Sequence, residues 1–209
     1  MRRKKTKKTK LTDEEVKTAA ARLMAAAQAH QRASVYCMNK PDAKPPNIDW
    51  FFFNVVSIEM ILLSVEQSLR LLLLLHYRIV RDDTNHTPRV LYQTMTRKSG
   101  GAAGIRAAIV AHTNAIGSLR SIPATTEKEI LACLNKHNAS YTNFRYFQLN
   151  QQGKVNPDFG FKGRDLQILH TLALALISLN TKEMKERKIG MYASMSVVSE
   201  SEMTDDLRH

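Results

Sequence analysis

The sequence predicts an all-α protein, an up-and-down helical bundle with one core. Several long segments repeat apolar residues at helical spacing, and β-favouring residues gather in a single short region, 141–161. A chain of 209 residues is long enough for one core of good size and short for two domains. We therefore expect a bundle over 12–189, preceded by a basic flexible arm at 1–11 and followed by a loose tail at 190–209.

The first helix is expected over residues 12–38. It opens with Thr12 and Glu15, the spacing of a capping box, in which each side chain binds the other residue's backbone N–H. Apolar residues then recur on one face, at Val16, Ala19, Ala20, Leu23, Met24 and Ala27. Prolines at positions 41, 45 and 46 end the helix.

The second helix is expected from Asn47 or Asp49 to about residue 81, in the most apolar part of the chain. A bilayer span needs roughly 20 consecutive apolar residues and tolerates a central charge poorly. Glu59, Glu66 and Arg70 all fall inside this segment. We therefore predict the central helix of a soluble bundle, and no integral membrane segment.

These three charged residues lie close to one stripe of the second helix, because positions four and seven apart share a face. Glu66 and Arg70 have the acid-first order that favours an ion pair within a helix. They could form a partly solvated pair, or, together with Glu59, line a polar cleft between helices or subunits.

The rest of the chain also favours helices, apart from one segment. A small hairpin or irregular insert is expected over 141–161, where Gly153, Asn156, Pro157 and Gly160 favour turns. The helices are expected near 90–95, over 102–119, from Thr125 or Thr126 to about 136, and from 162–164 to about 188.

The formal charge of +12 and the pI of about 9.9 indicate anionic partners. Much of this charge lies in residues 1–10, where seven of ten residues are Arg or Lys. Such an arm could bind phosphates through counterion release, attach to an anionic membrane surface, serve as a targeting address, or simply add solubility.

Two cysteines, Cys37 and Cys133, are too few for a disulfide framework. We identified no Cys or His at zinc-ligand spacing near either of them, and expect no metal and no cofactor. The basic start runs into polar residues 12–15 and not into an apolar core, so we expect no secretory signal. A reducing cytoplasm is the simplest location.

Several short segments, taken in order, resemble the HEPN superfamily of helical-bundle domains. They are Glu66, Leu69, Arg70 and Leu73 in the second helix, then His86 and Leu91, then Phe144, Arg145 and Tyr146 before the last helix. The resemblance implies a homodimer with polar residues lining the cleft between the subunits. Many HEPN proteins are metal-independent ribonucleases whose motif is an Arg followed, after a short spacer, by a His.

Two segments fit that motif, Arg164 with His170 at the start of the last helix and, as a second choice, Arg81 with His86. In the implied chemistry, His moves a proton and Arg holds the phosphate as negative charge builds on it. His170 also lies among leucines, so a buried histidine without catalytic function explains the same residues. Arg145, Tyr146 and Lys162 are candidates for RNA binding, although Arg145 could instead pair with a buried carboxylate.

Two functions therefore stay open. The first is an endoribonuclease of toxin or defence type that acts on RNA, with an antitoxin or regulatory protein as partner. The alternative is a noncatalytic HEPN bundle that binds RNA, a nucleotide or a protein. A homodimer is expected in either case.

Overall fold

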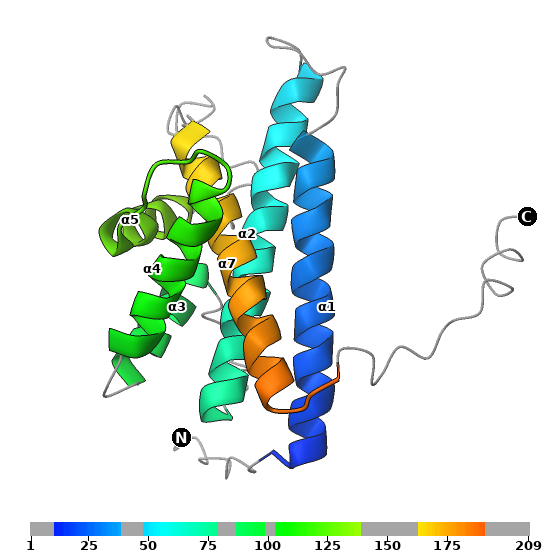
Figure 1. Ribbon diagram of the computed structural model, residues 1–209. Coiled ribbons are helices and arrows are strands. Elements are labelled where there is room, and N and C mark those ends of the chain that lie inside the picture. The colour runs from blue at the N-terminus through cyan, green and yellow to red at the C-terminus, as the bar shows by residue number, and fades with distance from the viewer. Residues whose placement is uncertain (1–10, 39–47, 79–86, 99–102, 139–162, 191–209) are drawn as a thin grey trace, which may run out of the picture.

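A computed structural model describes residues 11–38, 48–78, 87–98, 103–138 and 163–190 (Figure 1). Within these ranges the chain is helical and contains no strand, which confirms the all-α prediction. The helices are α1 (Asp13–Met38), α2 (Ile48–Tyr77), α3 (Pro88–Lys98), α4 (Ala103–Ser118), α5 (Glu127–Asn138) and α7 (Gly163–Glu186). The hairpin or irregular insert expected over 141–161, the arm at 1–10 and the tail beyond 190 lie outside the described residues.

Capping boxes begin two of these helices. At α1, Glu15 accepts hydrogen bonds from the Thr12 backbone N–H at 2.8 Å and from its hydroxyl at 2.9 Å. At α5, Glu129 accepts the same two bonds from Thr126. The pairs satisfy N–H groups that a helix start leaves without intrahelical partners, so the sequence pattern positions both helix starts.

The end of α2 comes earlier than the sequence predicts, at Tyr77 and not near residue 81. Arg78 has a φ of 50°, a left-handed conformation that stops the helix. Its guanidinium binds the Asp13 carboxylate and the Leu11 carbonyl at the start of α1. Tertiary contacts with α1 therefore fix this helix end.

Apolar residues cover α2 almost all the way round, as expected for a helix enclosed by protein. The five consecutive leucines at 71–75 are all buried. Leu71, Leu74 and Leu75 join a cluster with residues of α1, whereas Leu72 and Leu73 join the larger core formed with α3, α4, α5 and α7. The prediction that α2 is the central helix is confirmed. Among the described helices, none has an apolar stretch sufficient to cross a bilayer.

Small residues allow α1 and α2 to lie close together. Ser64 donates a hydrogen bond to the Ala27 carbonyl at 2.8 Å, and Ser34 and Ser57 each donate to the other's carbonyl, at 2.7 and 3.0 Å. These bonds satisfy hydroxyl groups that would otherwise be buried without partners.

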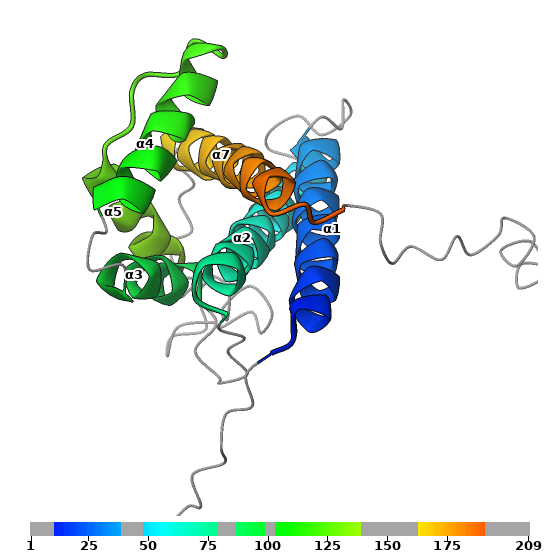
Figure 2. The same ribbon diagram turned by 60° about the horizontal axis from the view of Figure 1, so that its bottom comes forward.

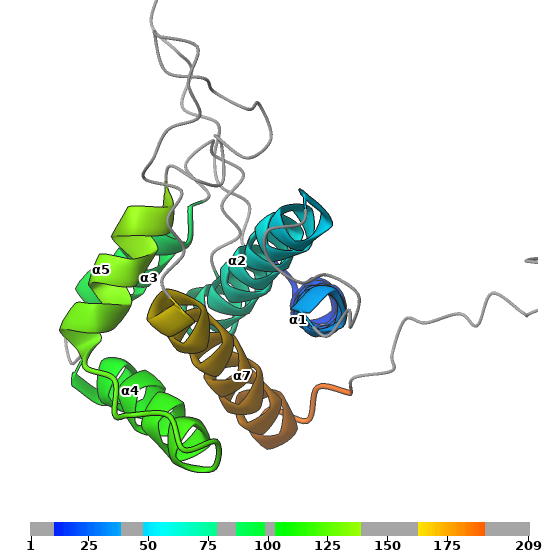
Figure 3. The same cartoon turned by 90° about the horizontal axis from the view of Figure 1, so that it is seen from above.

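The long helices do not simply alternate in direction. The end of α1 meets the starts of α2 and α7, and the start of α1 meets the ends of both, so α1 is antiparallel to two helices that are parallel to each other. The three shorter helices between α2 and α7 return the chain to the end at which α2 began. They lie on one side of α2 and α7, with α1 on the other (Figures 2 and 3).

Candidate functional site

Arg164 lies in the first turn of α7 and is occupied by contacts with the segment before α5. Its guanidinium donates to the carbonyls of Pro123 and Ala124, both at 3.1 Å, and to the Thr125 hydroxyl at 3.3 Å. It also lies 3.4 Å from the Glu129 carboxylate. These contacts fasten the start of α7 to the start of α5, which is a structural function.

His170 is buried where α1, α2 and α7 meet, with 4% of its surface exposed. Its Nε2 lies 3.1 Å from the Ser34 hydroxyl, and that hydroxyl donates its own proton to the Ser57 carbonyl. We therefore assign the His170 proton to Nε2, which leaves Nδ1 without a partner among the described residues. The geometry is that of a neutral histidine in a polar contact between helices.

Burial, and secondarily the charge of Arg120, lower the pKa of His170 to about 4. A general acid or base works best with a pKa close to the operating pH, and it must reach the substrate. His170 meets neither condition, and its contacts are with Ser34 whereas those of Arg164 are with the segment before α5. The catalytic function of Arg164 and His170 stays a prediction, and this monomer geometry does not favour it.

The polar residues of α2 have the predicted ion pair. Arg70 lies 2.8 Å from Glu66, whose side chain is 3% exposed. Glu59 is half-buried and lies about two turns before Glu66 on the same stripe. Whether these residues line a cleft between subunits stays a prediction, as does the homodimer. Arg81, His86, Arg145, Tyr146 and Lys162 lie outside the described residues.

A side-chain cluster that the sequence analysis missed lies between α5 and α7. Cys133, His137 and Asp165 each place one potential ligand atom within 4.8 Å of the other two. The statement that no His stands at ligand spacing from Cys133 was wrong, because His137 follows it by four residues and shares its face of α5. The four-residue spacing of Cys133 and His137 could have indicated these two members of the cluster. Asp165 is distant in the sequence, and only the fold brings it close to them.

Hydrogen bonds hold this cluster together. His137 Nε2 donates to Asp165 Oδ2 at 3.3 Å, and the Lys136 ammonium donates to the same oxygen at 2.6 Å. The Cys133 thiol donates to the Asp165 backbone carbonyl at 3.6 Å. Burial tends to raise the pKa of Asp165, but the bonds from Lys136 and His137 outweigh it and lower that pKa.

The cluster does not form a nucleophilic triad. Burial, reinforced by Asp165, raises the pKa of the Cys133 thiol to about 12. Reactive cysteines need a lowered pKa and access to solvent, and Cys133 is 4% exposed. Burial also lowers the pKa of His137, against the opposing effect of Asp165, so the imidazole is neutral near pH 7.

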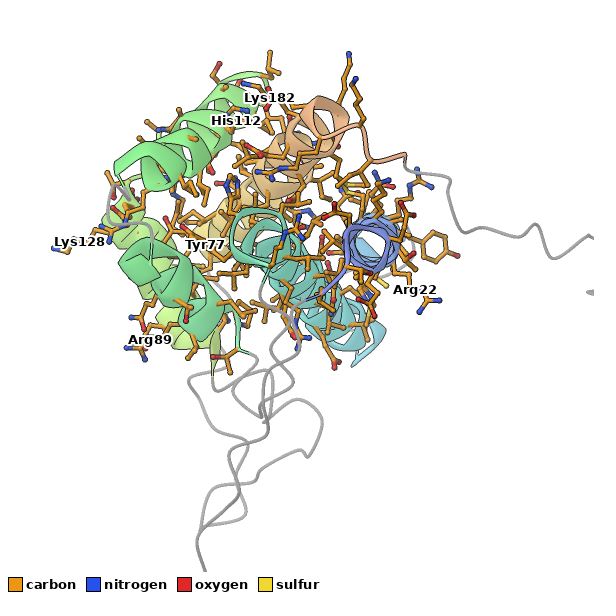
Figure 4. The ribbon with its side chains drawn as sticks, turned by 90° about the horizontal axis from the view of Figure 1, so that it is seen from below. Arg22, Tyr77, Arg89, His112, Lys128 and Lys182 are labelled. Atoms are coloured by element: carbon orange, nitrogen blue, oxygen red, sulfur yellow. The ribbon has the colours of Figure 1, made fainter. Side chains whose placement is uncertain are left out.

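Basic residues gather at the end of the bundle where α1 begins. Leu11, which follows the basic segment 1–10 in the sequence, packs against the cluster that contains Val16, Met184 and Ile189. There the chain reads KEMKERK over 182–188. Figure 4 views the molecule from this end and shows Lys182 at the periphery, beside α7.

The acidic groups at this end are already engaged. Asp13 binds Arg78, Glu14 binds Lys17, and Glu15 caps α1. Farther along, Glu183 binds Arg187 and Glu186 binds Lys182. Within the described ranges Lys185 and Lys188 have no such partner. We use "basic end" for Lys185 and Lys188 together with residues 1–10.

Comparisons with family models, with curated proteins and with solved structures find no match to this chain.

Proposed function

We propose that this chain is a noncatalytic RNA-binding bundle of the HEPN type that holds RNA at its basic end. The observation that carries this proposal is the packing of Leu11 against the cluster that contains Ile189. In the sequence, Leu11 directly follows the segment with seven basic residues, and Ile189 directly follows Lys188, which is exposed like Lys185. A cluster of Lys and Arg on one face attracts phosphates and releases their counterions.

We prefer the noncatalytic alternative because of the contacts that the two motif residues, Arg164 and His170, make within the protein. Arg164 donates to groups of the segment before α5, and His170 is buried against Ser34. The Arg164 guanidinium already donates to protein groups, and His170 has almost no exposed surface for a substrate to reach. Lys185 and Lys188, in contrast, are exposed.

RNA is preferred to an anionic membrane because residues 2–10 contain no aliphatic or aromatic side chain. A surface-bound membrane segment normally adds apolar insertion to its charge, and one weak signal alone gives marginal attachment. Phosphate binding by a segment rich in Lys and Arg needs charge alone.

The test measures the anisotropy of a fluorescein-labelled single-stranded RNA as the full-length protein is added. The Lys185→Glu/Lys188→Glu variant should bind several times more weakly than the parent, because both residues line the proposed contact. The matched control, Arg32→Glu/Lys128→Glu, makes the same charge change at exposed positions elsewhere. Arg32 lies about 30 Å along α1 from Thr12, and Lys128 lies on a different side of the molecule from Lys182 (Figure 4).

Equal loss of affinity in both double variants would contradict a localised site. Stronger binding to phosphatidylserine vesicles than to RNA would replace RNA with a membrane. Cleavage of the RNA that is abolished by His170→Gln would restore the ribonuclease function.

A further inference from the structure

We propose that Cys133, His137 and Asp165 form a zinc site that links α5 to α7. One thiol, one imidazole and one carboxylate are the ligand types that Zn²⁺ takes in proteins. The three potential ligand atoms lie within 4.8 Å of one another. Cys133 and His137 are almost completely buried, with 4% and 3% of their surfaces exposed.

The existing geometry is close to that of a zinc centre. Bonds of about 2.0–2.3 Å at tetrahedral angles place ligand atoms about 3.3–3.8 Å apart. His137 Nε2 and Asp165 Oδ2 already lie 3.3 Å apart. Because all three atoms lie within 4.8 Å of one another, no separation has to shrink by more than about 1 Å.

Helical spacing explains why two ligands meet without help from the rest of the fold. Cys133 and His137 are four residues apart on α5, so their side chains project from the same face. Asp165 comes from the first turn of α7, which Arg164 holds against the start of α5 through its bonds to Pro123 and Ala124. The arrangement is therefore fixed before a metal binds.

Binding zinc changes three existing contacts. His137 Nε2 must bind the metal through its lone pair, so its hydrogen bond to Asp165 Oδ2 is lost and the proton of the neutral imidazole moves to Nδ1. The Cys133 thiol loses its proton to solvent when sulfur binds the metal, and its hydrogen bond to the Asp165 carbonyl is lost. The Lys136 ammonium, 2.6 Å from Asp165 Oδ2, must give up that oxygen to the metal. One thiolate and one carboxylate then neutralise the charge of the ion, and water takes the fourth position.

The test titrates the full-length, reduced protein with Co²⁺, which replaces Zn²⁺ and reports on its ligands. A thiolate-to-cobalt charge-transfer band should appear in the near ultraviolet, saturate at one ion per chain and disappear when Zn²⁺ is added. Cys133→Ser should lose the band. Cys37→Ser, which removes the chain's other cysteine from α1, should retain it.

Zinc should also raise the midpoint of thermal unfolding of the parent protein but not that of Cys133→Ser. Absence of the cobalt band, its persistence in Cys133→Ser, or its loss in Cys37→Ser would overturn the proposal. If circular dichroism shows that Cys133→Ser is unfolded, Asp165→Asn takes its place, and it should bind Co²⁺ several times more weakly.

Lys136→Met gives a second test that does not remove a ligand. Because its ammonium competes with the metal for Asp165, this variant should bind zinc at least severalfold more tightly. Unchanged or weaker affinity would overturn the assignment of Asp165 as a ligand. Lys128→Met, on the exposed surface of the same helix, is the matched control and should leave the affinity unchanged.

Discussion

At the scale of single residues, His170 is the clearest case of a side chain whose surroundings decide its chemistry. Its folded pKa is lowered to about 4 from 6.5 by burial and then by Arg120. An unfolded chain binds a proton at this site near pH 6.5, whereas the folded chain does not. The free energy of unfolding is therefore highest, as far as His170 is concerned, above pH 6.5. It decreases as the pH falls from 6.5 towards 4, because the unfolded chain then binds a proton that the folded chain does not.

We predict that this decrease amounts to about 3 kcal/mol between pH 6.5 and 4. Urea unfolding at a series of pH values measures it. His170→Gln should flatten the dependence in that window by up to about 1.4 kcal/mol per pH unit. His112→Gln, on α4, is the matched control; equal flattening in both variants would show that His170 is not the residue responsible.

Residue positions explain what the sequence could and could not predict about a site. The spacing of Arg164 and His170 matches the ribonuclease motif, but the fold turns Arg164 to Pro123 and Ala124 and buries His170 against Ser34. The spacing of two residues in the sequence does not reveal the tertiary contacts that each side chain makes. Conversely, the spacing of Cys133 and His137 was visible, while Asp165 joins them only through the packing of α7 on α5.

At the scale of the elements, local chemistry predicted the helix starts well. The capping boxes at Thr12 and Thr126 place the starts of α1 and α5, because Glu15 and Glu129 bind groups within the same turn. The end of α2 was misplaced because Arg78 binds Asp13 and Leu11, which are distant in sequence. The reversal of direction between α1 and the pair α2 and α7 likewise depends on packing between helices.

The end of α7 has a Schellman arrangement with an unusual residue. Ile189 N–H donates to the Met184 carbonyl at 2.9 Å, and Lys188 N–H donates to the Lys185 carbonyl at 3.0 Å. Lys188 has a φ of 54°, in the left-handed region where glycine is normally preferred. A lysine in this strained position is consistent with a need for its charge at the basic end.

We predict that Lys188→Gly raises the free energy of unfolding by about 1 kcal/mol, because it relieves the left-handed strain. The same substitution should weaken RNA binding. Arg187→Gly, one position earlier, is the control and should lower stability by about 0.5–1 kcal/mol. Chemical denaturation and RNA anisotropy on the same samples measure both effects. A less stable Lys188→Gly protein would contradict the strain argument, and unchanged RNA affinity would remove Lys188 from the contact.

At the scale of the whole molecule, the bundle separates two features. The interior between α5 and α7 holds the Cys133, His137 and Asp165 cluster, while the basic end gathers charge where α1 begins and α7 ends. Composition predicted the charge of +12 and its concentration in residues 1–10. It could not predict that Leu11, which follows this segment in the sequence, packs against the cluster that contains Ile189, the residue after Lys188.

The most direct test of RNA binding at the basic end is the salt dependence of the affinity for a single-stranded RNA. It is measured for the full-length protein and for a variant in which the seven basic residues of segment 1–10 are replaced by glutamine. Each neutralised phosphate contributes about −0.7 to the slope of log K against log salt concentration. We predict a steep slope for the parent and a slope shallower by up to about 5 for the variant. Equal slopes in the two proteins would contradict the proposed site.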